Sequence, residues 1–205
     1  MAAPPSQPSR VFAIVPAAGR SRRMGTPKQF LDVGGRTMLD ALLQPLLAAD
    51  IAGVLLVTHQ GIAEQLSLPD DPRIQLAANE DEHSEMIDSI RIGLRAWRKR
   101  EQINDADGFL VCPADHPGIT TKDFNRCVTG FCSAPDRIVI ATRAGKRGHP
   151  IIFPAALTAF VESSACDAGL NALPRQHADH IVHVECTSAG VSRDIDTPQD
   201  YEALD

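Results

Sequence analysis

The chain has 205 residues, of which 43% are hydrophobic and 22% are charged, and its formal net charge is −6 at pH 7. This length allows one α/β domain with a sizeable core, and the acidic balance argues against a general nucleic-acid-binding surface. The five cysteines form no Cys-x-x-Cys pair, which argues against a disulfide framework or a zinc site and predicts a reducing, cytoplasmic location. No apolar stretch of about 18 residues occurs, so we expect no transmembrane helix and no membrane partner.

The N-terminal residues differ in character from the rest of the chain. Residues 1–10 include three prolines and no apolar run, so we expect a disordered tail and not a signal peptide. The domain is then expected to span residues 11–205. It opens with the apolar run from Val11 to Val15, which is typical of a buried strand in a parallel sheet, and Pro16 is expected to end that strand.

Small residues and cations follow this first strand. The small residues are Ala17, Ala18, Gly19, Ser21 and Gly25, and the cations are Arg20, Arg22, Arg23 and Lys28. Small residues let the backbone approach a ligand, and consecutive amide N–H groups form a concave anion site. The cations would neutralise a triphosphate. A solvated basic loop is the alternative, but the spacing Gly-x-Ser-x-Arg-Met-Gly with a following Lys favours phosphate binding, although it is not a Walker P-loop.

Strands and helices alternate along the remaining chain. Strands are expected over residues 53–58, 73–78, 107–112, 137–142 and 180–184, and helices over 37–47, 64–68, 84–100, 121–132 and 154–163 and after Thr197. Pro45 is expected to kink or break its helix. This alternation predicts an α/β fold, a single-domain, Rossmann-like three-layer sandwich with a mostly parallel sheet. Ligands of such sheets bind at the carboxyl ends of the strands.

Carboxylates stand at two places where they would reach such a ligand. Asp115 follows the strand at 107–112, between two prolines, and it is either a hard oxygen ligand for Mg²⁺ or a turn residue. Asp194 and Asp196 are two residues apart and would face the same side of an extended segment. Asp196 is otherwise only the residue before a helix cap at Thr197, with Pro198 at the first helical position.

The segment Ala17–Lys28 resembles the signature AAGxSxRMGxxK of the MobA-like nucleotidyltransferases, and it is most similar to the branch that transfers CMP to the molybdenum cofactor. The resemblance extends over residues 11–204 and implies the nucleotide-diphospho-sugar transferase type of fold. It also implies a nucleoside triphosphate, with CTP expected from the Ala-Ala-Gly form, together with Mg²⁺ and a molybdopterin-type acceptor. A molybdoenzyme or a chaperone is the partner that this branch implies.

The resemblance implies a role for each matching residue. Arg23, Lys28 and Asp115 are expected to be catalytic, and Asp115 and Asp196, with Asp194 as second choice, are expected to hold the metal. The expected nucleotide-binding residues are Ala17, Ala18, Gly19, Ser21, Arg23, Met24, Gly25, Lys28 and Ser89. Gly148 and His149, in a Gly-His-Pro stretch, are expected to lie in a loop over the acceptor, and a turn without a function is the alternative.

One departure from the family pattern keeps two other functions open. Glu85 stands where the family has glycine, and with Asp88 it would disfavour a nearby anion. The stretch from Pro27 to Leu31 also resembles the methylerythritol-phosphate cytidylyltransferases, which implies a CTP-dependent transferase for a sugar or polyol phosphate, but their usual Asp-Ala-Ala-Arg is absent. A non-catalytic nucleotide-binding or cofactor-binding module is the other alternative. Glu85 would support it, whereas Asp115 with the later pair of aspartates argues against it.

Overall fold

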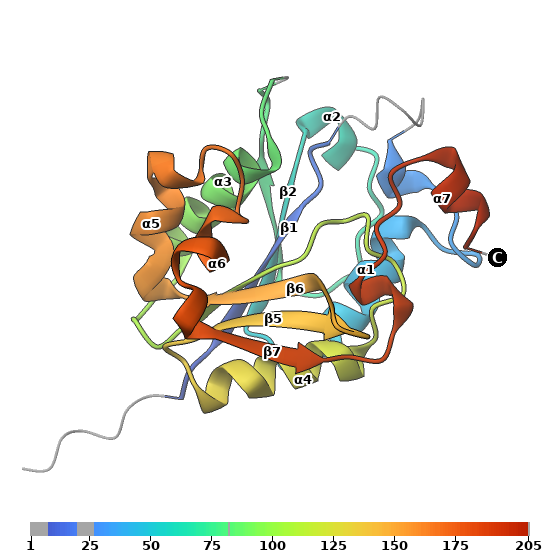
Figure 1. Cartoon of the computed structure of the whole chain (residues 1–205). Coiled ribbons are helices and arrows are strands. Elements are labelled where there is room, and N and C mark those ends of the chain that lie inside the picture. Colours follow the sequence, from blue (N-terminus) through green and yellow to red (C-terminus); the bar gives the residue numbers. More distant parts are fainter. Residues whose placement is uncertain (1–7, 20–26, 82, 205) are drawn as a thin grey trace, which may run out of the picture.

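One mixed sheet forms the centre of the protein in the computed structural model, which describes residues 8–19, 27–81 and 83–204. Within these ranges, seven strands lie in the order β3-β2-β1-β4-β6-β5-β7 (Figure 1). The strands are β1 (Val11–Pro16), β2 (Gly53–Thr58), β3 (Ile74–Ala78), β4 (Gly108–Val111), β5 (Ile138–Arg143), β6 (Lys146–Pro154) and β7 (Ile181–Glu185). Every pair is parallel except the two that β6 makes with β4 and β5, so the predicted mostly parallel sheet is confirmed.

Helices cover both faces of this sheet (Figure 1). They are α1 (Met38–Leu47), α2 (Gln60–Ala63), α3 (Met86–Arg100), α4 (Thr121–Ser133), α5 (Thr158–Glu162), α6 (Ala172–Gln176) and α7 (Pro198–Glu202). Side chains of α1 and α4 bury one core, and side chains of α3, α5 and α6 bury the other. The three-layer α/β prediction is therefore confirmed. None of the helices in the described ranges is long and apolar enough to cross a membrane.

Strand β1 joins the two cores because its side chains alternate between the faces of the sheet. Ala13 contributes to the core under α1 and α4, whereas Phe12 contributes to the core under α3. Trp97 of α3 packs on Phe12 with 5.0 Å between the ring centroids, and its indole N–H donates to the Ala13 carbonyl at 3.0 Å. The large Trp97 ring is therefore buried with its one polar group hydrogen-bonded, and these two contacts hold α3 across β1.

The predicted N-terminal tail is described only from residue 8 onward. Arg10, at its end, donates from Nη2 to Asp107 Oδ2 at 2.8 Å, and its backbone N–H donates to Oδ1 of the same carboxylate at 3.1 Å. Asp107 is fully buried just before β4. Residue 10 is thus bound to the domain.

Two details of the shorter helices differ from the predictions. The helix expected over residues 64–68 lies instead at Gln60–Ala63, because the His59 side chain accepts a hydrogen bond from the Gly61 N–H at 3.2 Å and caps it there. Pro45 does not break α1, which continues to Leu47. Pro45 stands in the last turn, where it removes one backbone hydrogen bond. The burial of the apolar face of α1 stabilises the helix by more than this loss costs.

Helix α3 begins two residues later than predicted. Its first residue is Met86, and the backbone N–H of Glu85 donates to Asp88 Oδ2 at 2.9 Å in a capping box. Asp88 also lies 3.7 Å from the Arg91 guanidinium. The charge of Asp88 is therefore engaged at the start of the helix, where a carboxylate stabilises the unpaired N–H groups.

The stretch Gly148–Pro150 lies inside β6, so the prediction that it forms a loop is wrong. Strands β5 and β6 form a hairpin whose turn residues, Ala144 and Gly145, have φ angles of 49° and 76°, as the common two-residue hairpin turn requires. The register then shifts, so that residues 148–150 of β6 stand opposite Ala141 alone. Such a bulge turns side chains out of the regular alternation, and here it redirects His149.

Asp123 connects helix α4 to the chain that follows β7. Its fully buried carboxylate accepts hydrogen bonds from the Thr120 hydroxyl at 2.6 Å and from the Thr187 N–H at 2.9 Å. Burial alone would raise the pKa of Asp123, but these hydrogen bonds outweigh it and lower the pKa to about 2.

We expect this carboxylate to contribute about 2–3 kcal/mol of stability that disappears as the pH falls from about 4 to about 2. The sign follows because the folded pKa lies below the unfolded value of about 3.9, so the ionised form is favoured by folding. Urea unfolding of the wild type and of Asp123→Asn across this pH range measures the effect. The variant should be less stable at pH 7 and should lose less stability in acid, and equal acid dependence in both proteins would contradict the assignment.

Candidate active site

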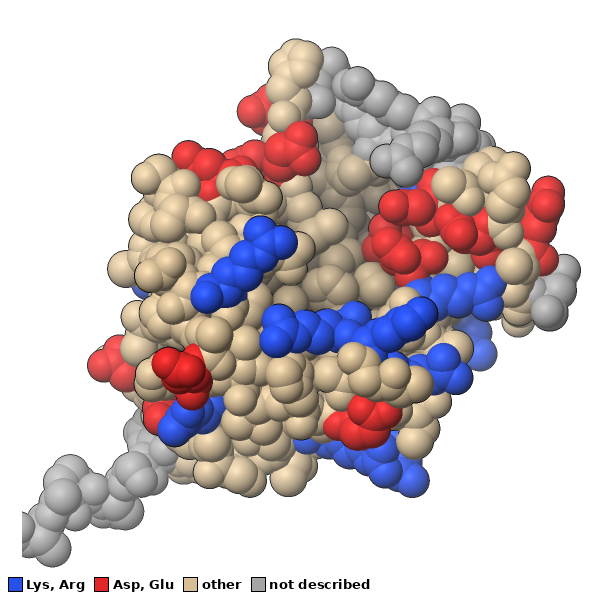
Figure 2. Space-filling model, in the orientation of Figure 1, with Lys and Arg blue, Asp and Glu red and all other residues tan. Residues whose placement is uncertain are grey.

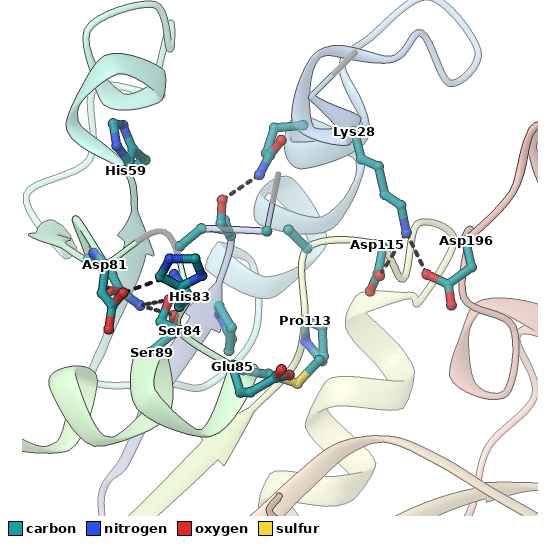
Figure 3. A pocket seen from close by; sticks show the side chains of 18 residues that line it. Lys28, His59, Asp81, His83, Ser84, Glu85, Ser89, Pro113, Asp115 and Asp196 are labelled. Atoms are coloured by element: carbon teal, nitrogen blue, oxygen red, sulfur yellow. Dashed lines mark hydrogen bonds and ion pairs between the residues drawn. The ribbon is translucent and has the colours of Figure 1, made fainter. Parts of the chain in front are cut away.

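A cleft with a volume of about 630 Å³ lies at the carboxyl ends of β1 and β4. Residues 16–19, at the end of β1, line its floor, and residues 113–115, shortly after β4, line one side. Ser89, in α3, lies on the opposite side (Figure 3), and Asn79, after β3, lines the cleft as well. The cleft is therefore at the edge of the sheet where ligands of parallel α/β folds bind.

The backbone after β1 is held open toward the cleft. The Ala17 carbonyl accepts hydrogen bonds from the Gln29 side-chain amide and, at 3.2 Å, from the Thr58 hydroxyl. Among the described residues, no heavy atom outside its chain neighbours lies within 4 Å of a Cβ placed on Gly19. Ala17, Ala18 and Gly19 thus line the cleft, and their predicted nucleotide-binding role stays a prediction. Four further predicted nucleotide contacts, Ser21, Arg23, Met24 and Gly25, lie outside the described residues.

Lys28 brings the two predicted metal carboxylates together. Its Nζ lies 2.6 Å from Asp196 Oδ1 and 3.4 Å from Asp115 Oδ2 (Figure 3). The Lys28 side chain is 15% exposed, that of Asp115 is 23% exposed and that of Asp196 is 46% exposed, so the pair with Asp115 is the better shielded from water. Two carboxylates that both reach one ammonium group converge on one region of space, at the wall of the cleft.

This donor set fits a hard divalent cation. Mg²⁺ is commonly held by one or two carboxylates, with phosphate oxygens and water completing its shell. In the part of the chain that the structure describes, no group of three or more His, Cys, Asp or Glu side chains is placed to hold a metal. Among the carboxylates that line the cleft, Asp115 and Asp196 are the pair that meets at Lys28, so any metal held by this pair would need further ligands from substrate or water.

Two glycines bring the segment of residues 186–196, here called the C-terminal segment, against the rest of the site. A Cβ on Gly148 of β6 would lie 1.7 Å from the Val191 carbonyl oxygen, and a Cβ on Gly190 would lie 2.4 Å from the Pro117 carbonyl oxygen. Neither position has room for a side chain. The C-terminal segment is thus packed directly between β6 and the chain that follows Asp115.

Asp194 and Asp196 do not share one side of this segment, contrary to the prediction. Ile195 between them is buried, and its N–H donates to the Asp115 carbonyl at 3.0 Å. Asp196 lines the cleft, whereas Asp194 is exposed and lines a separate hollow. Residues two apart face the same side only in a regular strand, and this segment forms none. Asp194 is therefore not placed with Asp115 and Asp196.

Sequence reasoning missed the buried amide that supports Ser89. Asn79 Nδ2 donates to the Ser89 hydroxyl at 2.9 Å and to the Ser84 hydroxyl at 3.0 Å, and both Asn79 and Ser89 are buried. The position of Asn79 directly after the strand at 74–78 was the available signal. Glu85 is exposed and lines the same cleft, so its carboxylate does face the ligand space.

His149 and Gly148 line a second, smaller hollow of about 250 Å³, together with His116 and Asp194. The His149 and His116 rings lie edge to face with 4.7 Å between centroids. Burial and the neighbouring His116 lower the pKa of His149 to about 3, although a hydrogen bond to the Val111 carbonyl opposes the shift, so the ring is neutral at pH 7. Gly148 lies beside the hollow chiefly because of its close packing on Val191.

Similar proteins were found by sequence and by structure. The MobA-like NTP transferase domain family matches residues 13–181. A 2-C-methyl-D-erythritol 4-phosphate cytidylyltransferase of Escherichia fergusonii is 36% identical over 140 residues, which are 62% of this chain and 56% of that protein. The match thus spans little more than half the length of that relative.

Solved structures match almost the whole chain. The crystal structure of a Mycobacterium tuberculosis rv0371c homologue from Mycobacterium sp. strain JC1 is 25% identical with a TM-score of 0.75, and the match covers 97% of this chain and 96% of that one. The manganese complex of Rv0371C from Mycobacterium tuberculosis H37Rv has the same fold, with 18% identity, a TM-score of 0.70 and coverage of 97% and 98%.

We expect Gly148→Ala to destabilise the protein by about 1–3 kcal/mol, because the added methyl group would overlap the Val191 carbonyl and push the C-terminal segment away. Gly61→Ala is the matched control, since a Cβ there would lie 3.5 Å from His59 Nδ1, an ordinary contact. Urea unfolding of the wild type and both variants measures the difference. A Gly148→Ala protein as stable as Gly61→Ala would refute the close approach.

Proposed function

This chain belongs to the MobA-like NTP transferase family, and from that premise we propose that it transfers CMP from CTP to a phosphorylated acceptor and releases pyrophosphate. The observation that carries the proposal is the convergence of Lys28, Asp115 and Asp196 beside the open backbone of residues 17–19. A fixed cation and two carboxylates at the mouth of a strand-end cleft are the charges that a magnesium-bound triphosphate requires.

The triphosphate is proposed to lie over residues 17–28, with Lys28 facing its phosphates. An oxygen of the acceptor phosphate attacks the α-phosphorus in line, the new O–P bond forms, and the bond to the leaving pyrophosphate breaks. This reaction needs positioning and charge neutralisation more than a side-chain nucleophile. The ion pairs with Asp115 and Asp196 hold the Lys28 ammonium at the cleft wall. Arg23 stays a predicted second cation.

Asp115 and Asp196 are proposed to hold the divalent cation, and we expect Mg²⁺. Their oxygens are ligands that this ion prefers, and the manganese complex of a protein with the same fold is in keeping with a divalent metal. When bound, the ion would neutralise charge on the phosphates. Asp194 is left out of the proposed ligand set because it lines the other hollow.

The acceptor is proposed to be a sugar or polyol phosphate. The name of the Escherichia fergusonii relative, a 2-C-methyl-D-erythritol 4-phosphate cytidylyltransferase, supports both this class of acceptor and cytidine as the base. A molybdopterin-type acceptor is the second candidate. It rests on the resemblance of residues 17–28 and 148–150 to the molybdenum cofactor branch and on the absence of Asp-Ala-Ala-Arg after β4.

We expect pyrophosphate release in the presence of Mg²⁺ to require both CTP and an acceptor. The assay combines CTP, GTP, ATP and UTP in turn with 2-C-methyl-D-erythritol 4-phosphate and with molybdopterin. The Ala18 methyl group narrows the floor of the cleft, which should hinder a purine, and steric discrimination of this kind is worth about 10- to 200-fold in rate. No release with any pair would refute the transferase proposal, and equal rates with GTP would refute the choice of CTP.

The Ala18→Gly variant tests the basis of that preference. Removal of the methyl group should raise the rate with GTP and leave the rate with CTP nearly unchanged. Calorimetric titration of both proteins with both nucleotides, at fixed Mg²⁺, separates binding from turnover. An unaltered preference in Ala18→Gly would assign base selection to other residues.

We expect Asp115→Asn to keep its fold and to lower Mg²⁺-dependent turnover by at least about 100-fold, because the amide keeps the shape of the side chain but not its charge. Asp136→Asn is the control, since the Asp136 side chain is 73% exposed and lines no part of the cleft. Turnover is measured against Mg²⁺ concentration, with thermal unfolding to check the fold. Full activity of Asp115→Asn would place the metal elsewhere and return Asp115 to a turn role.

A further inference from the structure

The second hollow is an unassigned feature that adjoins the proposed active site. Asp115 lines the cleft and His116, the next residue, lines the hollow; likewise Asp196 lines the cleft and Asp194 lines the hollow. Under the proposed function, an acceptor whose phosphate reaches Lys28 would have its other groups near this hollow. The residues that line the hollow would then be in a position to distinguish one phosphorylated acceptor from another.

The proton on the His149 ring is placed by its hydrogen bond. Nδ1 lies 3.3 Å from the Val111 carbonyl oxygen, and a carbonyl only accepts, so Nδ1 must carry the proton. In the neutral ring Nε2 then keeps its lone pair. No described residue makes a hydrogen bond to Nε2, and this atom is not sealed in the core. His149 lines the hollow, so the accepting nitrogen is available there.

The same hydrogen-bonding pattern holds the neighbouring ring. His116 Nδ1 lies 2.9 Å from the Gly190 carbonyl oxygen, so its proton also faces the backbone. The carboxylate of Asp194 adds a further hydrogen-bond acceptor to the hollow. Hydrogen-bond-accepting atoms at this wall favour a neutral O–H or N–H donor on a ligand, and they repel a phosphate.

Cations lie on the other side of the hollow. Figure 2 shows Lys and Arg side chains gathered over the β5–β6 hairpin, where Arg143, Lys146 and Arg147 are exposed. Arg147 lines the hollow, and its Nε donates to His183 Nε2 at 3.1 Å. The hairpin thus places positive charge beside the hollow, where it would face an anionic acceptor.

We propose that His149 determines acceptor specificity by accepting, through Nε2, a hydrogen bond from an O–H or N–H group of the acceptor substrate. The proposal rests on the proposed function, because it assumes a phosphorylated acceptor at this end of the sheet. It assigns to the acceptor a neutral hydrogen-bond donor away from its phosphate. Hydroxyl groups of a polyol and N–H groups of a pterin share this chemistry.

The first test is the ¹H–¹⁵N spectrum of the histidine rings in the wild-type protein at pH 7, with the His149 signals assigned from their loss in His149→Gln. We expect the proton on Nδ1 and a bare Nε2. The Nε2 signal should move when 2-C-methyl-D-erythritol 4-phosphate or pterin is added, and it should not move with inorganic phosphate. A proton on Nε2, or an equal response to inorganic phosphate, would overturn the proposal. The probe that moves the Nε2 signal shows whether the hollow prefers a polyol or a pterin.

The second test compares three variants in the pyrophosphate-release assay. His149→Phe should raise the KM for the acceptor about 10-fold, the worth of one hydrogen bond, with the KM for CTP unchanged. His149→Gln, whose amide oxygen accepts near the position of Nε2, should recover part of this loss. His180→Phe, at an exposed position outside the hollow, is the control. Unchanged acceptor KM in a folded His149→Phe protein would refute the role.

The failure of this proposal and of the proposed function are distinguishable. If no acceptor supports pyrophosphate release, the transferase function fails, while the ring spectrum and its response to the probes still decide where the His149 proton lies. If release occurs but His149→Lys matches the wild type in acceptor KM, the function stands and a cationic role replaces the accepting one.

Discussion

The site depends on the direct backbone packing of the C-terminal segment between β6 and the chain after Asp115. Gly148 and Gly190 permit this approach, because a methyl group at either position would overlap a carbonyl oxygen. The Ile195 N–H then bonds the Asp115 carbonyl, and this fixes where Asp196 lies. Buried Asp123 holds the beginning of the same segment through the Thr187 N–H. Two carboxylates far apart in the chain meet only because all these contacts hold one segment.

Charge balance then explains the arrangement of Lys28. Two carboxylates directed at one region repel each other unless a cation lies between them, and the ammonium group of Lys28 meets both. Under the proposed function, a divalent cation would take over this neutralisation and leave the ammonium to face the phosphates. The second hollow has a different character, since His149 directs a hydrogen-bond-accepting nitrogen to it and Arg147 lines it as well. The two neighbouring spaces therefore favour different chemical groups of one substrate.

Much of the fold was predictable because it rests on local signals. The apolar run at residues 11–15 is strand β1, and Thr120 and Thr197 cap α4 and α7 as their hydroxyl groups and positions indicate. The order of strands and helices predicted a mostly parallel sheet with its ligand edge after β1 and β4. Lys28 and Asp115 were candidates because they are charged residues in the segments that follow β1 and β4. Asp196 was a candidate through its spacing with Asp194 and through the resemblance to the family. The start of α3 after Glu85 and the cap at His59 were missed because Glu and His are uncommon N-cap residues, whereas the neighbouring Ser84 is a common one.

By itself the sequence determined the layers, the sheet edge and the chemistry available there, because apolar periodicity and capping act over a few residues. Only the tertiary structure decided which carboxylate joins Asp115, because Asp194 and Asp196 differ in the contacts of buried Ile195 and not in residue type. It also decided that residues 148–150 form a bulge within β6, since a register shift belongs to a pair of strands. The proton position on His149 follows from the Val111 carbonyl on β4, the other neighbour of β6, and no local pattern encodes this contact.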